Sequence, residues 1–131
     1  MAHSAHFSDA ELACPCCGVN GCTQELVDSL EALRLLNGGP VNLTSAYRCP
    51  SHNAAIHGAK DSAHMKGEAA DFHIRGKSVA EMEALARRVY TFRGIGRNDH
   101  LGFVHADTRK KPAQWCYGPN GQQCTYYKAA A

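Results

Sequence analysis

The chain has 131 residues, a length that suits one domain and leaves little room for a catalytic domain plus a separate targeting domain. Hydrophobic residues make up 44% of it and charged residues 20%, which excludes a disordered or a fibrous chain, and the formal net charge of +2 is too small to indicate nucleic acid as a partner. We therefore expect a single folded domain over residues 1–131 that works as a monomer.

Apolar periodicity predicts the first elements of the chain. After Thr23, which suits a helix N-cap, apolar residues recur every three or four positions until Gly38, so we predict an amphipathic helix over residues 24–37. Residues 41–47 alternate apolar and polar side chains and predict a strand, which ends before Pro50.

The rest of the chain alternates between strand and helix patterns. A capping box of Ser78 and Glu81 predicts the start of the second long helix. This helix is predicted over residues 79–91, and a short helix over 51–56. A loop is predicted over 60–67, and strands over 69–74, 94–97 and 103–107. We expect an irregular tail over residues 112–131, anchored by Trp115. This order predicts an α+β fold, a small antiparallel sheet with flanking helices.

Seven cysteines are many for a chain of this length, and an odd number cannot all pair within one molecule. Four lie at positions 14, 16, 17 and 22, one lies at position 49, and Cys116 and Cys124 flank a Gly-Pro-Asn-Gly turn. A zinc cluster is one interpretation of the N-terminal group, but the paired C-x2-C spacing typical of such clusters is missing. We favour a structural role, with small buried thiols and a Cys116–Cys124 disulfide that closes the turn.

A histidine and an aspartate with metal-ligand character surround the predicted loop-to-strand junction. His64 and Asp71 are separated by six residues that include Gly67 and two alanines, so a turn at Gly67 brings the imidazole and the carboxylate together and leaves space for a metal ion. His105, in a predicted apolar strand, offers a third ligand. Two nitrogens and one carboxylate oxygen leave a fourth position for water, as in catalytic zinc sites.

The motif around these residues resembles that of a known family. The segment Ser62-Ala-His-Met-Lys-Gly-Glu-Ala-Ala-Asp71 fills every fixed position of the S-x-H-x-x-G-x-A-x-D signature of the M15 zinc peptidases, which are D-Ala-D-Ala carboxypeptidases and peptidoglycan endopeptidases. Thr44-Ser-Ala-Tyr-Arg-Cys-Pro50 resembles the family's arginine-bearing segment, and Phe103-Val-His-Ala-Asp107 resembles its last zinc-ligand strand.

The resemblance, which runs from about Cys14 to Trp115, implies specific roles for individual residues. It implies one Zn²⁺, on the sheet, with His64, Asp71 and His105 as ligands. It also implies Arg48 as a substrate-binding or transition-state-stabilising cation, because a guanidinium can hold a carboxylate or an oxyanion with two parallel hydrogen bonds. Ser62 and Tyr47 lie in the same segments and are expected to bind substrate.

The general base is the role on which the sequence is least informative. Many relatives carry it two or three positions before the last zinc ligand, as H-x-H or D/E-x-x-H, whereas this chain has Phe103 and Gly102 there. We rank Asp99 first and His100 second, because a hairpin turn can fold them over the metal. Asp107 is third, because it shares a strand face with the last ligand and suits a supporting role as well as that of a base.

These features predict zinc-dependent hydrolysis of peptide bonds in the stems or cross-links of bacterial peptidoglycan, and hence cell-wall lysis. The chain shows no apolar run that spans a membrane. Because it shows neither a signal peptide nor a wall-binding domain, we expect a phage endolysin made in the cytoplasm and released to the wall through a holin. The alternative is a catalytically inactive zinc-binding module of the same fold, used for protein or wall binding.

Overall fold

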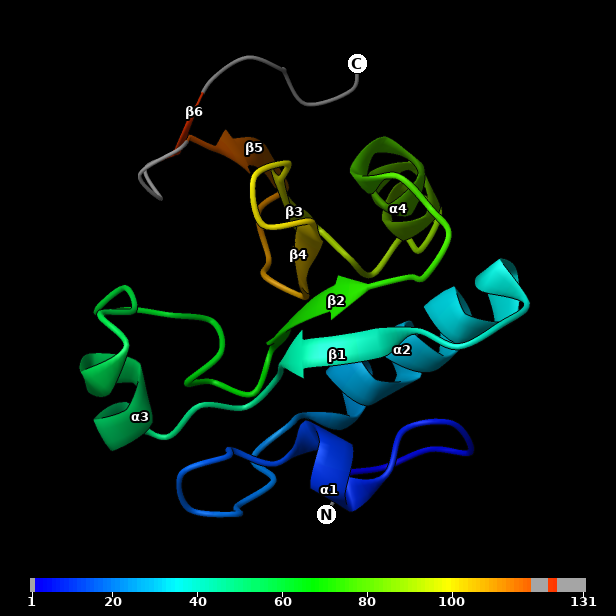
Figure 1. Ribbon diagram of the computed structural model, residues 1–131. Coiled ribbons are helices and arrows are strands. Elements are labelled where there is room, and N and C mark those ends of the chain that lie inside the picture. The colour runs from blue at the N-terminus through cyan, green and yellow to red at the C-terminus, as the bar shows by residue number, and fades with distance from the viewer. Residues whose placement is uncertain (1, 119–122, 125–131) are drawn as a thin grey trace.

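The computed structural model describes residues 2–118 and 123–124 of the chain, which form helices and one mixed sheet (Figure 1). The helices are α1 (Asp9–Leu12), α2 (Gln24–Asn37), α3 (Pro50–Ala55) and α4 (Val79–Arg87). The strands are β1 (Asn42–Ser45), β2 (Ala69–His73), β3 (Gly94–Asn98), β4 (Phe103–Asp107), β5 (Ala113–Tyr117) and β6 (Gln123–Cys124). The predicted α+β class is confirmed.

Local sequence explains where the two long helices begin and end. The Thr23 side chain accepts a backbone hydrogen bond at the start of α2, and Gly38, with φ 70°, ends that helix in the left-handed conformation. The capping box predicted for Ser78 and Glu81 starts α4. The helix predicted over 24–37 is confirmed, whereas α4 ends at Arg87, earlier than predicted. None of the helices in the described residues is long and apolar enough to cross a bilayer.

The strands lie in the order β1-β2-β4-β3-β5-β6, and all pairs are antiparallel except β3 and β5. The expectation of an irregular tail from residue 112 is wrong at Ala113–Tyr117, because this segment pairs with β3 as a parallel strand. Trp115 lies opposite Gly96 in that pairing and is largely buried, so it does anchor this part of the chain. Residues 119–122 and 125–131 lie outside the described part of the chain.

The cysteines fall into separate environments. Cys116 is disulfide-bonded, and the register of β5 and β6 places Cys124 opposite it, although the Cys124 side chain lies outside the described atoms. Cys14 and Cys22 are buried thiols, as expected. The expectation of buried thiols is wrong for Cys16 and Cys17, which are exposed, because their loop between α1 and α2 runs over the surface.

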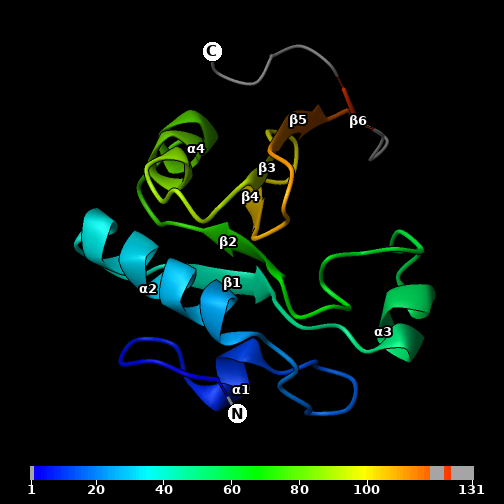
Figure 2. The ribbon, with the colours of Figure 1, turned by 180° about the vertical axis from the view of Figure 1, so that it is seen from behind.

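The two faces of the sheet have different neighbours. Alternate residues of β2 and β4 point to one face, where Phe72 and Val104 join the apolar core together with Leu30 of α2 and Met82 of α4. Figure 2, seen from behind, shows α2 lying in front of β1. The intervening residues, Asp71 among them, therefore point to the face that these helices leave open.

Candidate metal centre

Three side chains meet on this open face. Asp71 of β2 and His105 of β4 are directly paired across the antiparallel ladder, so their side chains leave the sheet side by side. His64 comes from the loop between α3 and β2. Its backbone carbonyl accepts hydrogen bonds from the N–H groups of Arg48 (3.1 Å) and Gly67 (3.3 Å), which hold the loop against the end of β1.

The donor atoms of this group have the spacing of ligands around one small cation. Asp71 Oδ1 lies 3.1 Å from His105 Nδ1 and 3.3 Å from His64 Nε2, and one ligand atom from each residue lies within 4.8 Å of the others. Tetrahedral ligands at about 2.0–2.1 Å from Zn²⁺ are separated by roughly 3.4 Å. The separations found here therefore fit a single tetrahedral ion.

The hydrogen bonds of His64 leave one ring nitrogen available for a metal. His64 Nδ1 lies 2.7 Å from the Ala46 carbonyl oxygen and donates to it, so Nε2 carries the lone pair. Nε2 is buried and has no hydrogen-bond partner within the described residues. A buried nitrogen without a partner is costly, and a cation between His64 and Asp71 would satisfy it.

His105 is held from the opposite side by a buried carboxylate. His105 Nε2 lies 2.7 Å from Asp107 Oδ2, so a proton on Nε2 turns the Nδ1 lone pair toward Asp71. Arg109 holds Asp107 in turn, with its Nε at 2.8 Å from Oδ1 and its Nη2 at 2.7 Å from Oδ2. Carboxylate-histidine pairs of this kind orient and strengthen metal-ligating imidazoles.

The aromatic and glycine residues around His105 complete the pocket. The Trp115 ring lies 5.3 Å from the His105 ring, and the Arg109 guanidinium stacks over Trp115 at 4.7 Å. Gly96 makes room for this ring, because a Cβ there would lie 2.3 Å from Trp115 Nε1. The sequence analysis assigned no site role to Arg109 or Trp115. Arg109 follows two residues after Asp107, just beyond the end of β4, and this short spacing of an acidic and a basic residue is the signal that would have found the fork.

The charges of these groups are strongly coupled. Burial would raise the pKa of Asp71, but its close contacts with the His105 and His64 imidazoles outweigh burial and hold that pKa well below its usual range. Burial likewise opposes ionisation of Asp107, and the bonds from Arg109 and His105 keep its pKa low. Burial lowers the pKa of His105, whereas its bonds to Asp107 and Asp71 raise it to about 9. The two carboxylates of Asp71 and Asp107 thus stabilise positive charge placed between them.

Arg48 lies beside the ligands but is not open to solvent. Its side chain is only 11% exposed. Nη1 donates to Asn53 Oδ1 at 3.0 Å and Nε donates to Ser45 Oγ at 3.2 Å, while Nη2 lies 3.7 Å from Asp71 Oδ2. These contacts draw the guanidinium inward, where it faces the second oxygen of the Asp71 carboxylate.

The other predicted site residues lie at different distances from the ligands. Ser62 is buried, and its hydroxyl accepts the His64 backbone N–H at 3.2 Å, so it shapes the ligand loop. The Tyr47 ring packs against Gly21, where a Cβ would lie 2.6 Å from it. Asp99 is half exposed at the β3–β4 turn and forms a fork with Arg97, with oxygens at 2.7 and 3.1 Å.

His100 is exposed in the same turn. The register pairs His105, the last of the predicted ligands, with Gly96, so the turn begins about three residues, or roughly 10 Å, farther along the strand. Of the three candidate bases, Asp107 is the one that lies at hydrogen-bond distance from a predicted ligand, with its Oδ2 at 2.7 Å from His105 Nε2. The general-base roles of Asp99 and His100 stay predictions.

Comparison with known proteins agrees with this geometry. The family model described as Peptidase M15 matches residues 5–107, which include all three predicted ligands. The chain belongs to the peptidase M15 family. The peptidoglycan L,D-endopeptidases MepK of Escherichia coli (strain K12) and of Shigella flexneri are each 37% identical to it over 90 residues, which cover 63% of this chain and 49% of the relative. The chain thus spans about half the length of these curated relatives.

The M15 ligand loop depends on the backbone conformation of Gly67. Gly67 has φ +72°, and a Cβ there would lie 1.9 Å from the Gly21 carbonyl oxygen. Gly67→Ala should therefore lower the free energy of unfolding by about 2–5 kcal/mol, through left-handed strain and a backbone clash. Gly76→Ala is the matched control, since Gly76 has φ +85° with no atom within 4 Å of a Cβ. This control should lower the free energy of unfolding, measured with urea, by about 1–2 kcal/mol, because only the left-handed backbone strain applies there. Equal losses in the two variants would refute the clash.

The raised pKa of His105 predicts how the stability of the metal-free protein varies with pH. The folded pKa, about 9, exceeds the usual value of 6.5, so the charged His105 stabilises the fold fully below about pH 6.5, and this contribution is lost as the pH rises through 9. With a chelator present, the free energy of unfolding should fall by up to about 3 kcal/mol over this interval. Urea unfolding of His105→Gln under the same conditions should lack this fall. An unchanged pH dependence in that variant would assign it to other groups.

Proposed function

We propose that the protein is a zinc-dependent hydrolase of peptide bonds in bacterial peptidoglycan, acting as an endopeptidase on stem or cross-link peptides. The observation that carries the proposal is the convergence of His64 Nε2, Asp71 Oδ1 and His105 Nδ1 on one point of the open sheet face. Bound there, Zn²⁺ supplies Lewis acidity for amide hydrolysis and a water of lowered pKa. The MepK relatives are peptidoglycan L,D-endopeptidases by name, which supports a bond between an L and a D residue as the one cut.

Each surrounding residue has a separate part in this proposal. Ala46 fixes the His64 tautomer through its carbonyl, and Asp107 fixes that of His105. Arg48 places a permanent positive charge 3.7 Å from Asp71, from where it can stabilise negative charge that develops at the ligands or hold a carboxylate of the substrate. Peptidoglycan stems carry such carboxylates beside their amides, which makes a buried arginine a suitable recognition group.

Digestion of purified peptidoglycan tests the activity directly. The zinc-loaded protein should release peptides whose new amino termini, identified by mass spectrometry, report which bond is cut. His105→Ala should lose both the metal and the release, because one of the three ligands is gone. A protein that binds zinc stoichiometrically but releases no peptide would instead favour the inactive zinc-binding module. New termini at D-Ala alone would favour a carboxypeptidase.

Asp107→Asn tests the residue that holds His105. We expect zinc affinity to fall by about 10- to 100-fold, because the amide can present an N–H to the imidazole and favour the wrong tautomer. Asp99→Asn is the matched control, since Asp99 contacts Arg97 and should leave zinc affinity unchanged. Competition with a chelator measures both affinities. Equal zinc affinity in the two variants would contradict the role of Asp107.

Turnover of zinc-saturated variants then addresses the general base. A base is usually worth about 10²- to 10⁴-fold in rate. A loss of that size in Asp99→Asn, with zinc content intact, would identify Asp99, and the same loss confined to His100→Ala would identify His100. If zinc-saturated Asp107→Asn loses turnover and the other two variants do not, the proton transfer belongs to Asp107.

A further inference from the structure

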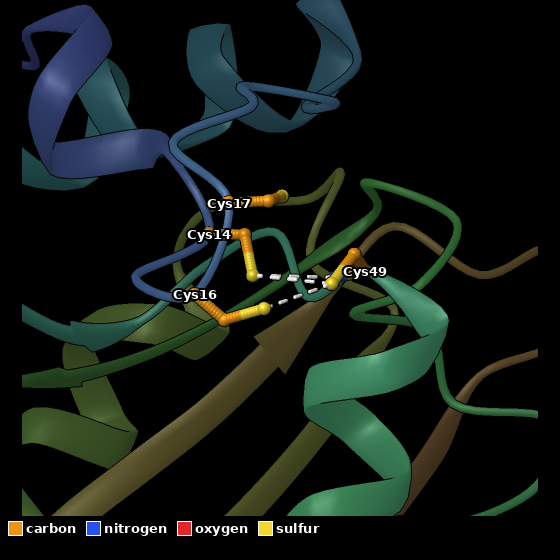
Figure 3. Close-up of side chains that lie close together, drawn as sticks. All are labelled: Cys14, Cys16, Cys17 and Cys49. Carbon is orange, nitrogen blue, oxygen red and sulfur yellow. Dashed lines mark hydrogen bonds between the residues drawn. The ribbon is translucent and has the colours of Figure 1, made fainter.

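A second group of metal-binding side chains lies away from the His64 site. Cys14, Cys16 and Cys17 come from the loop between α1 and α2, and Cys49 is the N-cap of α3 (Figure 3). One sulfur atom from each of the four lies within 4.8 Å of the others. All four are free thiols, and they come from two segments more than thirty residues apart.

The sulfur separations distinguish a metal site from a disulfide or from core packing. Cys49 Sγ lies 3.7 Å from Cys14 Sγ and 3.5 Å from Cys16 Sγ. Tetrahedral thiolates at about 2.3 Å from one Zn²⁺ are separated by roughly 3.8 Å, close to both values. Burial of apolar surface does not explain the cluster, because Cys16 and Cys17 are exposed yet direct their sulfurs to the same place.

The backbone around the cluster has the features of a metal-binding turn. Cys14 and Cys17 form one C-x2-C pair, in place of the two such pairs typical of zinc clusters, and Gly18 follows in the left-handed conformation, with φ 73°. The turn is closed by hydrogen bonds from Gly18 N to Cys14 O and from Cys14 N to Val19 O, both 2.8 Å. The sulfurs also accept backbone N–H groups, from Cys49 to Cys14 Sγ and from His52 to Cys49 Sγ, both at 3.4 Å.

We propose that Cys14, Cys16, Cys17 and Cys49 bind a structural divalent cation of the zinc type. Four thiolates this close repel one another, and a soft divalent cation removes that repulsion and is the ion that such a sulfur set selects. The site is closed, with four protein ligands and no position for a substrate. It is therefore distinct in chemistry from the His64 centre.

The position of the cation would let it connect two segments near the His64 centre. Cys49 directly follows Arg48, and the same segment contains Ala46, whose carbonyl accepts from His64. The ion would tie this segment to the N-terminal loop. It would thereby hold both the His64 tautomer and the Arg48 side chain that faces Asp71.

Cobalt substitution in the full chain tests the cysteine site by itself. In His64→Ala/His105→Ala, which removes two ligands of the other centre, added Co²⁺ should bind at about one equivalent and give a near-ultraviolet thiolate-to-cobalt band. The further change Cys49→Ser should abolish the band. Cys22→Ser is the matched control, because Cys22 is a free thiol outside the cluster, and it should retain the band. A folded double variant with no band overturns the proposal.

Metal content of the otherwise unchanged chain provides the second test, which does not depend on folding of the double variant. The zinc-loaded chain should contain about two equivalents, and Cys16→Ser, at an exposed position, should contain about one. One equivalent in both, or a disulfide from Cys49 to Cys14 or Cys16 in freshly purified protein, refutes the site. Because neither readout uses peptidoglycan, failure of the proposed hydrolysis would leave this result unaffected, and the reverse also holds.

Discussion

The shared Asp71 carboxylate is the contact on which the rest of the centre depends. One of its oxygens faces His105 at 3.1 Å and His64 at 3.3 Å, and the other faces Arg48 at 3.7 Å. A buried carboxylate is costly unless it is paired, so these positive or metal-binding partners are required for the fold as well as for chemistry. The antiparallel pairing of β2 with β4 sets the first of the contacts, because it places Asp71 and His105 directly opposite each other.

The division of the sheet into two faces lets a polar centre coexist with a small apolar core. Residues that alternate along β2 and β4 place Phe72 and Val104 against the helices, while Asp71 and His105 leave the opposite face. On that face, glycines of β3 provide the space. A Cβ at Gly94 would meet Asp107 at 2.2 Å, and one at Gly96 would meet Trp115, so the supporting carboxylate and the aromatic wall both depend on missing side chains in the neighbouring strand.

The segment that follows β1 links the two groups of metal-binding residues. Within four positions it supplies the carbonyl of Ala46, the Arg48 guanidinium and the Cys49 thiol. If the cysteine cluster holds a cation, as proposed, the loop between α1 and α2 and the start of α3 become one unit beside the His64 centre. The cysteines would then act on the His64 centre through the backbone, by limiting the motion of a segment that has little regular secondary structure of its own.

The sequence by itself determined the long helices, four of the strands and the three converging ligands, because helix caps, period-two alternation and the spacing around Gly67 are local signals. It also identified the M15 family, since the filled positions between Ser62 and Asp71 carry the chemistry directly. Only the tertiary structure decided the parallel strand β5, the inward position of Arg48, the fork between Arg109 and Asp107, and the meeting of Cys49 with the N-terminal cysteines. These features join segments distant in the chain or depend on which way a side chain turns, and local patterns do not encode which remote residues will pair when the sheet assembles.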